Sequence, residues 1–151
     1  MRKLVAAAVC ALALAVPGSS PAQTQPGWSY AYIDGVATAT ERDQRGRVTA
    51  TLTCRAPTGD IVLSDFTLAR HARRATTSAV RIGALSVNVP SSVQGRGNNR
   101  ALVINLPQRP PILAAVQPTD QLSVTVNNQT HTFLEGGPAR MREVAWGCWG
   151  S

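Results

Sequence analysis

The stretch Arg47–Arg55, RVTATLTCR, decides the fold predicted for this chain. Its alternate residues are apolar, and the residues between them are threonines flanked by arginines. This period of two is typical of a β-strand with one face on a core and the other in water. Cys54 lies on the apolar face, so a covalent partner must reach it through the interior.

Cys148 is the partner that the sequence indicates. Residues 138–146 predict a C-terminal helix that begins at a proline. Apolar residues with the spacing of one helix face follow through it and just beyond: Met141, Val144, Ala145 and Cys148. Because this stripe delivers Cys148 to the core that receives Cys54, we predict a Cys54–Cys148 disulfide.

Residues 1–22 have the pattern of a secretory signal peptide. A short cationic start precedes an apolar run, Leu4–Val16, which is too short to anchor the chain in a bilayer, and small residues lead up to Ala22. We expect cleavage after Ala22, which discards Cys10, and an oxidising destination where a disulfide forms. Residues 23–151 then form a single β-rich domain without a membrane span.

Turn signals separate short apolar-alternating segments in the mature chain, which predicts a mainly β fold. The strongest signal is Asp34-Gly35, a dipeptide typical of two-residue hairpins. Pairing across it places Tyr32 opposite Ala37 and Tyr30 opposite Ala39.

We expect a β-sandwich or half-barrel of about seven to nine strands, with a short helix near residues 111–116 and the C-terminal helix near 138–146. Gly83 shifts the phase of an apolar segment and splits it if a turn forms there. The parity of the apolar residues also changes after Leu63, which predicts a bulge near Ser64–Asp65. Residues 91–100 are polar and glycine-containing, which predicts a loop.

Arginine dominates the charge of the mature chain. Of 15 Lys and Arg, Arg2 and Lys3 lie in the signal, so 13 arginines against 8 Asp and Glu leave a formal charge of +5. A subset lies in two polar segments and the strand region between them: Arg70, Arg73, Arg74, Arg81, Arg96 and Arg100. Arginine forks suit phosphate or carboxylate groups. These residues form one anion-binding surface only if both loops lie at the same rim, and solvated, unpaired arginines are the alternative.

No catalytic residue, metal site or cofactor is predicted. The two histidines, His71 and His131, are far apart in sequence, and neither has a second ligand at helical or strand spacing. Both mature cysteines are committed to the disulfide, which leaves no thiol nucleophile. We interpret His131 as a half-buried, hydrogen-bonded side chain on an apolar face.

The order of elements in the last third of the chain is that of a known family. A short helix precedes a late strand pair, and a glycine-marked turn leads into a terminal helix. The segments are Ile112–Val116, Leu122–Val126, Thr132–Leu134, Gly136-Gly137 and Ala139–Val144. Here the chain resembles the invasion-associated locus B-like family of small exported bacterial proteins. The resemblance implies a β-rich periplasmic protein. The family has no established catalytic residues to carry over to this chain. The chain departs from the family in having two mature cysteines, where such proteins often carry more.

The sequence thus predicts a periplasmic or secreted cell-envelope protein that acts as a non-enzymatic accessory or binding protein. Its expected partner is an anionic envelope component or another envelope protein. One alternative is a small envelope hydrolase with His71 or His131 as its base. Another is an inhibitor of an envelope-directed protease or lysozyme, which would present residues 91–100.

Overall fold

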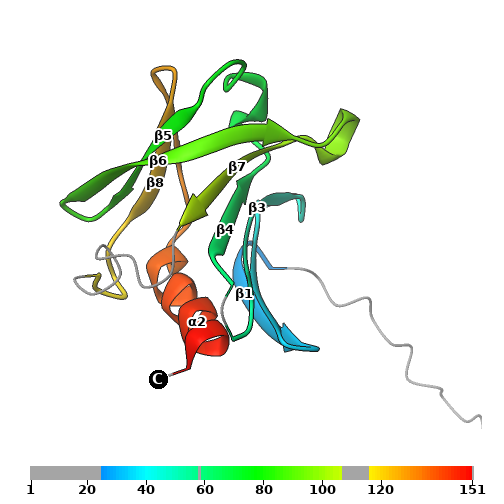
Figure 1. Cartoon of the computed structure of the whole chain (residues 1–151), viewed down its shortest axis with the longest axis vertical. Helices are drawn as coiled ribbons and strands as arrows, with labels where there is room; N and C mark the ends of the chain where they lie inside the picture. The colour runs from blue at the N-terminus through cyan, green and yellow to red at the C-terminus, as the bar shows by residue number, and fades with distance from the viewer. Residues whose placement is uncertain (1–24, 58, 107–115, 151) are drawn as a thin grey trace, which may run out of the picture.

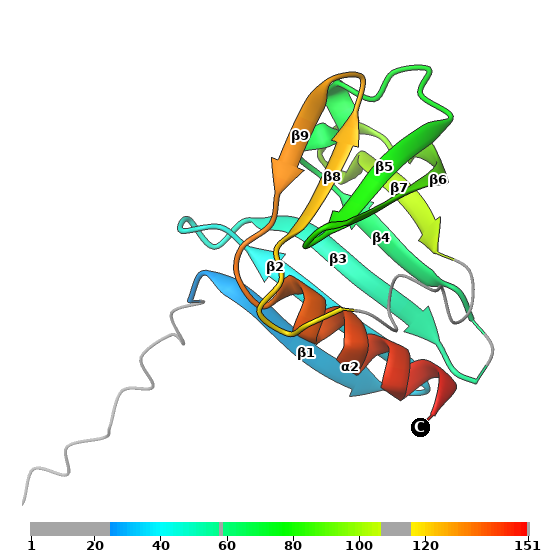
Figure 2. The ribbon, with the colours of Figure 1, turned by 90° about the vertical axis from the view of Figure 1, so that its left-hand side faces the viewer.

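The computed structural model describes residues 25–57, 59–106 and 116–150. Nine antiparallel strands form one sheet in the order β1-β2-β3-β4-β7-β6-β5-β8-β9. The sheet curls into a half-barrel, and the C-terminal helix α2 packs on its first three strands (Figure 1 and Figure 2). This architecture confirms the predicted mainly β fold, in its half-barrel form. The helix predicted near residues 111–116 lies outside the described residues, apart from Val116.

The first four strands follow one another as a meander. They are β1 (Gly27–Ile33), β2 (Val36–Arg42), β3 (Val48–Arg55) and β4 (Ile61–Asp65). The Asp34-Gly35 turn closes the predicted hairpin, and both of its residues have the positive φ that a type I′ turn requires, 49° and 74°. The register pairs Tyr32 with Ala37 and Tyr30 with Ala39, as predicted.

The predicted core face of β3 and the predicted helix stripe meet in the interior. Leu52 is fully buried and Cys54 is 2% exposed. Helix α2 (Gly137–Trp149) buries the whole predicted stripe beneath it. Cys54 and Cys148 form a disulfide with their Cα atoms 5.7 Å apart, which confirms the predicted pairing. Within the described ranges, no helix is long and apolar enough to span a membrane.

Strand β4 ends at Asp65 instead of passing through a bulge. Ile61, Leu63 and Asp65 all face inward, and a two-residue turn leads into the short 3-10 helix η1 (Leu68–Arg70), where Leu68 returns to the core. The predicted bulge near Ser64–Asp65 is therefore wrong. The alternation of apolar residues changes after Leu63 because the strand ends at Asp65 and a turn follows. The Asp65 side chain caps this turn by accepting a hydrogen bond from the backbone N–H of Leu68 at 2.9 Å.

The second half of the sheet contains five strands and a second short 3-10 helix. They are β5 (Thr77–Ile82), β6 (Leu85–Gln94), η2 (Gly97–Asn99), β7 (Ala101–Leu106), β8 (Leu122–Val126) and β9 (Gln129–Thr132). Gly83, with a φ of 58°, lies in the tight turn that separates β5 from β6. The split that the sequence allowed at this glycine is therefore present.

Strand β6 joins the two halves of the sheet. It pairs with β5 as far as Pro90 and with β7 from Ser91 to Gln94. The loop predicted for residues 91–100 is therefore wrong over its first four positions, and begins at Gly95. Proline has no backbone N–H to donate, and here it lies where the strand changes partner.

Candidate functional site

The η1 turn and the residues after it carry three exposed arginines, Arg70, Arg73 and Arg74. The segment is anchored from below, since Leu68 is 4% exposed and Ala72 is fully buried. Backbone N–H groups of His71 and Ala72 both donate to the carbonyl of Leu68. The chain is thus held close to the sheet while the arginine side chains face solvent.

The second arginine-bearing loop lies at the same end of the β5–β6 hairpin. Arg96 and Arg100 flank η2, beyond the end of β6, and the first loop enters β5 at Thr77, which pairs with Pro90. Four further residues of β6 separate the two loops, or about 13 Å of strand. We call the five residues at this end the arginine rim: Arg70, Arg73, Arg74, Arg96 and Arg100.

Arg81 does not belong to the arginine rim, although the sequence grouped it there. It pairs with Ser86 near the Gly83 turn, at the opposite end of the hairpin. Its Nε donates to the carbonyl of Gly83 at 2.9 Å. The rim therefore has five of the six predicted arginines, because β5 carries Arg81 away from the loop that precedes it.

The arginine rim lies in a part of the chain without acidic residues. Between Asp65 and Asp120 the sequence contains seven arginines and no Asp or Glu. Within the described residues, ion pairs form between Arg47 and Asp43, between Arg140 and Glu143, and between His131 and Asp65, but at no rim arginine. The acid-free span is a sequence signal that could have marked this surface without any structure.

Asp65 fastens the base of the first arginine loop. Its carboxylate is fully buried. Oδ1 accepts hydrogen bonds from the backbone N–H groups of Thr67 and Leu68, at 2.7 and 2.9 Å, and from the Thr67 hydroxyl at 2.8 Å. Oδ2 lies 2.8 Å from Nδ1 of His131. One side chain therefore ties the η1 turn to strand β9.

Asn127 braces the same loop from the β8–β9 turn. Its Nδ2 donates to the carbonyl of His71 at 3.0 Å and lies 3.5 Å from that of Arg73. Asn127 and Asn128 both have positive φ, 46° and 63°, as a tight hairpin turn requires. Figure 2 shows this turn beside the loop that leads into β5. The loop is thus positioned from two sides.

His131 is partly buried and hydrogen-bonded, as the sequence predicts. Its side chain is 18% exposed, and its ring lies 4.4 Å from that of Phe133, centroid to centroid. Burial works against protonation, but the hydrogen bond to Asp65 and the negative charges of Asp65 and Glu41 outweigh it and raise the pKa of His131 above its ordinary value. The structure therefore favours the charged imidazolium.

This raised pKa makes the stabilisation by His131 depend on pH. It is complete below the unfolded-state pKa of about 6.5 and declines as the pH rises through the folded-state pKa. We expect His131→Gln, which keeps a donor but no titrating group, to cost roughly 1.5–3 kcal/mol in acid and less in base. Urea unfolding of both proteins at about pH 5.5 and about pH 9 measures the difference. An equal cost at both values would contradict this role.

Glu41, near the end of β2, is a second buried carboxylate. It is 1% exposed, and it accepts hydrogen bonds from the Thr49 hydroxyl and from the backbone N–H of Leu134. The sheet register places Glu41, Ala50 and Asp65 in one row on the inner face. The predicted hairpin register already implied this position, since Glu41 has the parity of the buried Ala37.

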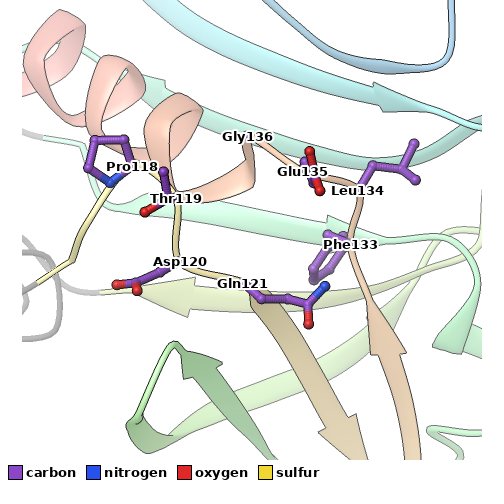
Figure 3. Close-up of a pocket in the computed structure, with 8 residues that line it drawn as sticks. All are labelled: Pro118, Thr119, Asp120, Gln121, Phe133, Leu134, Glu135 and Gly136. Carbon is purple, nitrogen blue, oxygen red and sulfur yellow. The ribbon is translucent and has the colours of Figure 1, made fainter.

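A groove lies between the segment before β8 and the segment before α2 (Figure 3). Its volume is about 470 Å³ and its lining comprises Pro118, Thr119, Asp120, Gln121, Phe133, Leu134, Glu135 and Gly136. The lining includes two carboxylates, but no histidine, serine or cysteine. Asp120 lies against Gly83, so the groove is at the Arg81 end of the β5–β6 hairpin. It is separate from the arginine rim.

Among the residues that the structure describes, no three His, Cys, Asp or Glu side chains lie together as a metal site. Comparison of the chain with models of protein families, with curated proteins and with solved structures finds no significant match. The candidate site is therefore defined by its own geometry: five arginines on two loops, four of them exposed and Arg100 partly exposed. The first of these loops is held in place by Asp65, His131 and Asn127.

Proposed function

We propose that this chain is a non-enzymatic envelope protein, periplasmic or secreted, that binds an anionic envelope component through the arginine rim. The observation that supports this most is that, within the described part of the chain, none of the five rim arginines forms an ion pair, although four of them are exposed. A partner that supplies negative charge would satisfy them. The resemblance to the invasion-associated locus B-like family agrees with an exported, β-rich protein.

The chemistry of arginine narrows the class of ligand. A guanidinium group presents a planar fork of donors that matches phosphate and carboxylate oxygens. Two groups of arginines separated by about 13 Å of strand suit a ligand that carries several negative charges, such as an anionic polymer or a cluster of lipid head groups. A single small anion would contact only one of the two loops.

A variant in which Arg70, Arg73 and Arg74 are replaced by serine should bind lipopolysaccharide at least about tenfold more weakly than the wild type. Each exposed ion pair contributes roughly 0.2–1 kcal/mol, so the middle of this range gives about 2 kcal/mol for three pairs, and 1.4 kcal/mol corresponds to a factor of ten. Wild-type binding should fall as salt rises from low to physiological concentration, because screening weakens attraction between exposed charges. Equilibrium binding at both salt concentrations measures these effects, with a neutral glycan as the control ligand. Unchanged affinity in the triple variant would contradict the proposal.

The hydrolase alternative has His71 or His131 as its general base, and the surroundings of His131 argue against that role. Nδ1 of His131 is hydrogen-bonded to Asp65, and no described serine, threonine or cysteine hydrogen-bonds to the imidazole. The ring therefore has no nucleophile beside it to activate, which favours the binding function. Asp65 also accepts three other hydrogen bonds that shape a turn. The Asp65–His131 pair is therefore better explained as a structural support of the first arginine loop than as a catalytic pair.

A further inference from the structure

Strand β1 presents a long, unprotected edge. It is the first strand in the sheet order, its sequence GWSYAYI contains no charge and no proline, and its pairing with β2 runs through seven residues without a bulge. The strand at the other edge, β9, has four residues. Natural sheets usually protect an edge with charges, prolines, bulges or short strands. Within the described part of the chain, no further strand pairs with β1.

The free hydrogen-bonding groups of this edge belong to three aromatic residues. Ile33 and Val36 flank the two-residue turn, so they form a hydrogen-bonded pair across it. Hydrogen-bonded and non-bonded pairs alternate along an antiparallel ladder. The backbone N–H and C=O groups of Trp28, Tyr30 and Tyr32 therefore point away from β2, toward the open side.

Exposed aromatic surface lies beside the same edge. Tyr32 is 52% exposed and Trp146, on α2, is 61% exposed. Helix α2 passes over this edge, because a Cβ atom added at Gly147 would lie 3.3 Å from the Tyr32 ring and 2.5 Å from the Tyr30 hydroxyl. The guanidinium of Arg142 lies 5.6 Å from the Trp146 ring centroid, so Trp146 packs against a side chain of its own helix. Tyr32 thus adds exposed aromatic surface directly at the uncharged edge.

We propose that this edge pairs with the β1 edge of a second copy of the chain, antiparallel and about a two-fold axis at Tyr30. In this register Tyr30 lies opposite its own equivalent, and Trp28 lies opposite Tyr32 of the second copy. These are the three residues whose backbone groups are free, so the pairs that they form are the hydrogen-bonded ones of the new ladder. Aromatic cross-strand pairs add to the stability of such a ladder.

The position of α2 fits this arrangement. The helix packs over β1, β2 and β3 and is therefore centred near β2. In the dimer the two β2 strands are three strand spacings apart, about 14 Å, whereas helices in direct contact are about 8–10 Å apart. The remaining gap accommodates Tyr32 from each copy. Both helices lie on the same face of the joined sheet without clashing.

Charge and area point to a second copy and to a reversible association. The paired strands carry no charge, so the positive chains do not repel each other at the seam. A fully buried aromatic residue removes about 150–250 Å² from water, and Tyr32, at 52% exposed, has roughly half of that left to bury. The interface is therefore smaller than the ~800 Å² per partner of a typical stable complex.

Sedimentation of the exported protein over roughly a hundredfold concentration range should show a shift from monomer to dimer. Tyr32→Lys should abolish this shift, because it places a charge on the seam. Leu85→Lys is the matched control, since Leu85 is 41% exposed at the β5–β6 turn, and it should dimerise like the wild type.

Cysteine cross-linking tests the register itself. Ser29 and Ala31 are exposed, and in the proposed pairing each lies opposite the other in the second copy, with Cα atoms about 4.5 Å apart, within reach of a disulfide. The double variant Ser29→Cys, Ala31→Cys should form a covalent dimer on oxidation, and Ser29→Cys alone should not. A monomer at every concentration, with no cross-link in the double variant, would overturn the proposal and leave the edge to a strand of another protein.

Discussion

Replacing Asp65 with alanine should reduce the free energy of unfolding by about 3–5 kcal/mol, the usual cost of removing one partner from a buried charged pair. The loss is large because four hydrogen-bond donors converge on this carboxylate. Without it, the backbone N–H groups of Thr67 and Leu68 and the ring of His131 lose their acceptor. Urea unfolding followed by circular dichroism measures the change.

Asp65→Asn is the matched control for this result. The amide oxygen can still accept from the η1 turn, and the amide nitrogen can donate to a neutral imidazole, so most of the geometry is retained while the charge is lost. We expect a smaller loss than for Asp65→Ala. A change of less than about 0.5 kcal/mol in Asp65→Ala, the range of an ordinary surface substitution, would show that the carboxylate does not hold the loop.

Removing the Cys54–Cys148 disulfide should cost about 2–5 kcal/mol, as is typical of a native disulfide in a small exported domain. The bridge joins residues 94 apart in sequence, so it closes most of the domain into one loop. It also fixes the C-terminal helix on β3. The double variant Cys54→Ala, Cys148→Ala should unfold at a lower urea concentration than the oxidised wild type.

The reduced wild-type protein is the control for this variant, because it retains both sulfur atoms in the core. Its loss of stability should be close to that of the double variant, with a small difference from packing. Mass spectrometry of a non-reduced digest should show the two cysteine-containing peptides linked. Equal stability of the oxidised and reduced proteins would contradict a structural role for the bridge.

Local periodicity made much of this fold predictable. The Asp34-Gly35 hairpin, the inward face of β3 and the stripe on α2 each depend on residues close in sequence, and each was found as predicted. The split at Gly83 could be anticipated for the same reason, since a glycine interrupts a regular alternation of apolar residues in the sequence. In the structure Gly83 has the positive φ of a turn.

Features that depend on pairing between distant strands were not predictable. Nothing local to Pro90 shows that β6 leaves β5 and pairs with β7, so Ser91–Gln94 was assigned to a loop. The contact between Asp65 and His131 joins residues 66 positions apart. The sequence predicts a bulge at Asp65 because it gives no sign that His131 is the partner of this carboxylate.

The arginine rim lies between these two cases. Its residues and a split at Gly83 could be found in the sequence, but the displacement of Arg81 to the opposite end of the hairpin required the register of β5. The acid-free span between Asp65 and Asp120 was available from the sequence alone. Composition could therefore have identified the surface, whereas strand pairing decided which arginines share it.

The central claim, that the arginine rim binds an anionic ligand by virtue of its position, is tested most directly by two variants with the same change in charge. The first replaces Arg70, Arg73 and Arg74 with serine, and the control replaces Arg45, Arg55 and Arg81, which are also exposed but lie outside the rim. Affinity for lipopolysaccharide at low salt should fall at least about tenfold in the rim variant and by less than about threefold in the control, where only the long-range field changes. Equal losses in the two variants would contradict the claim, because binding would then depend on net charge and not on the rim.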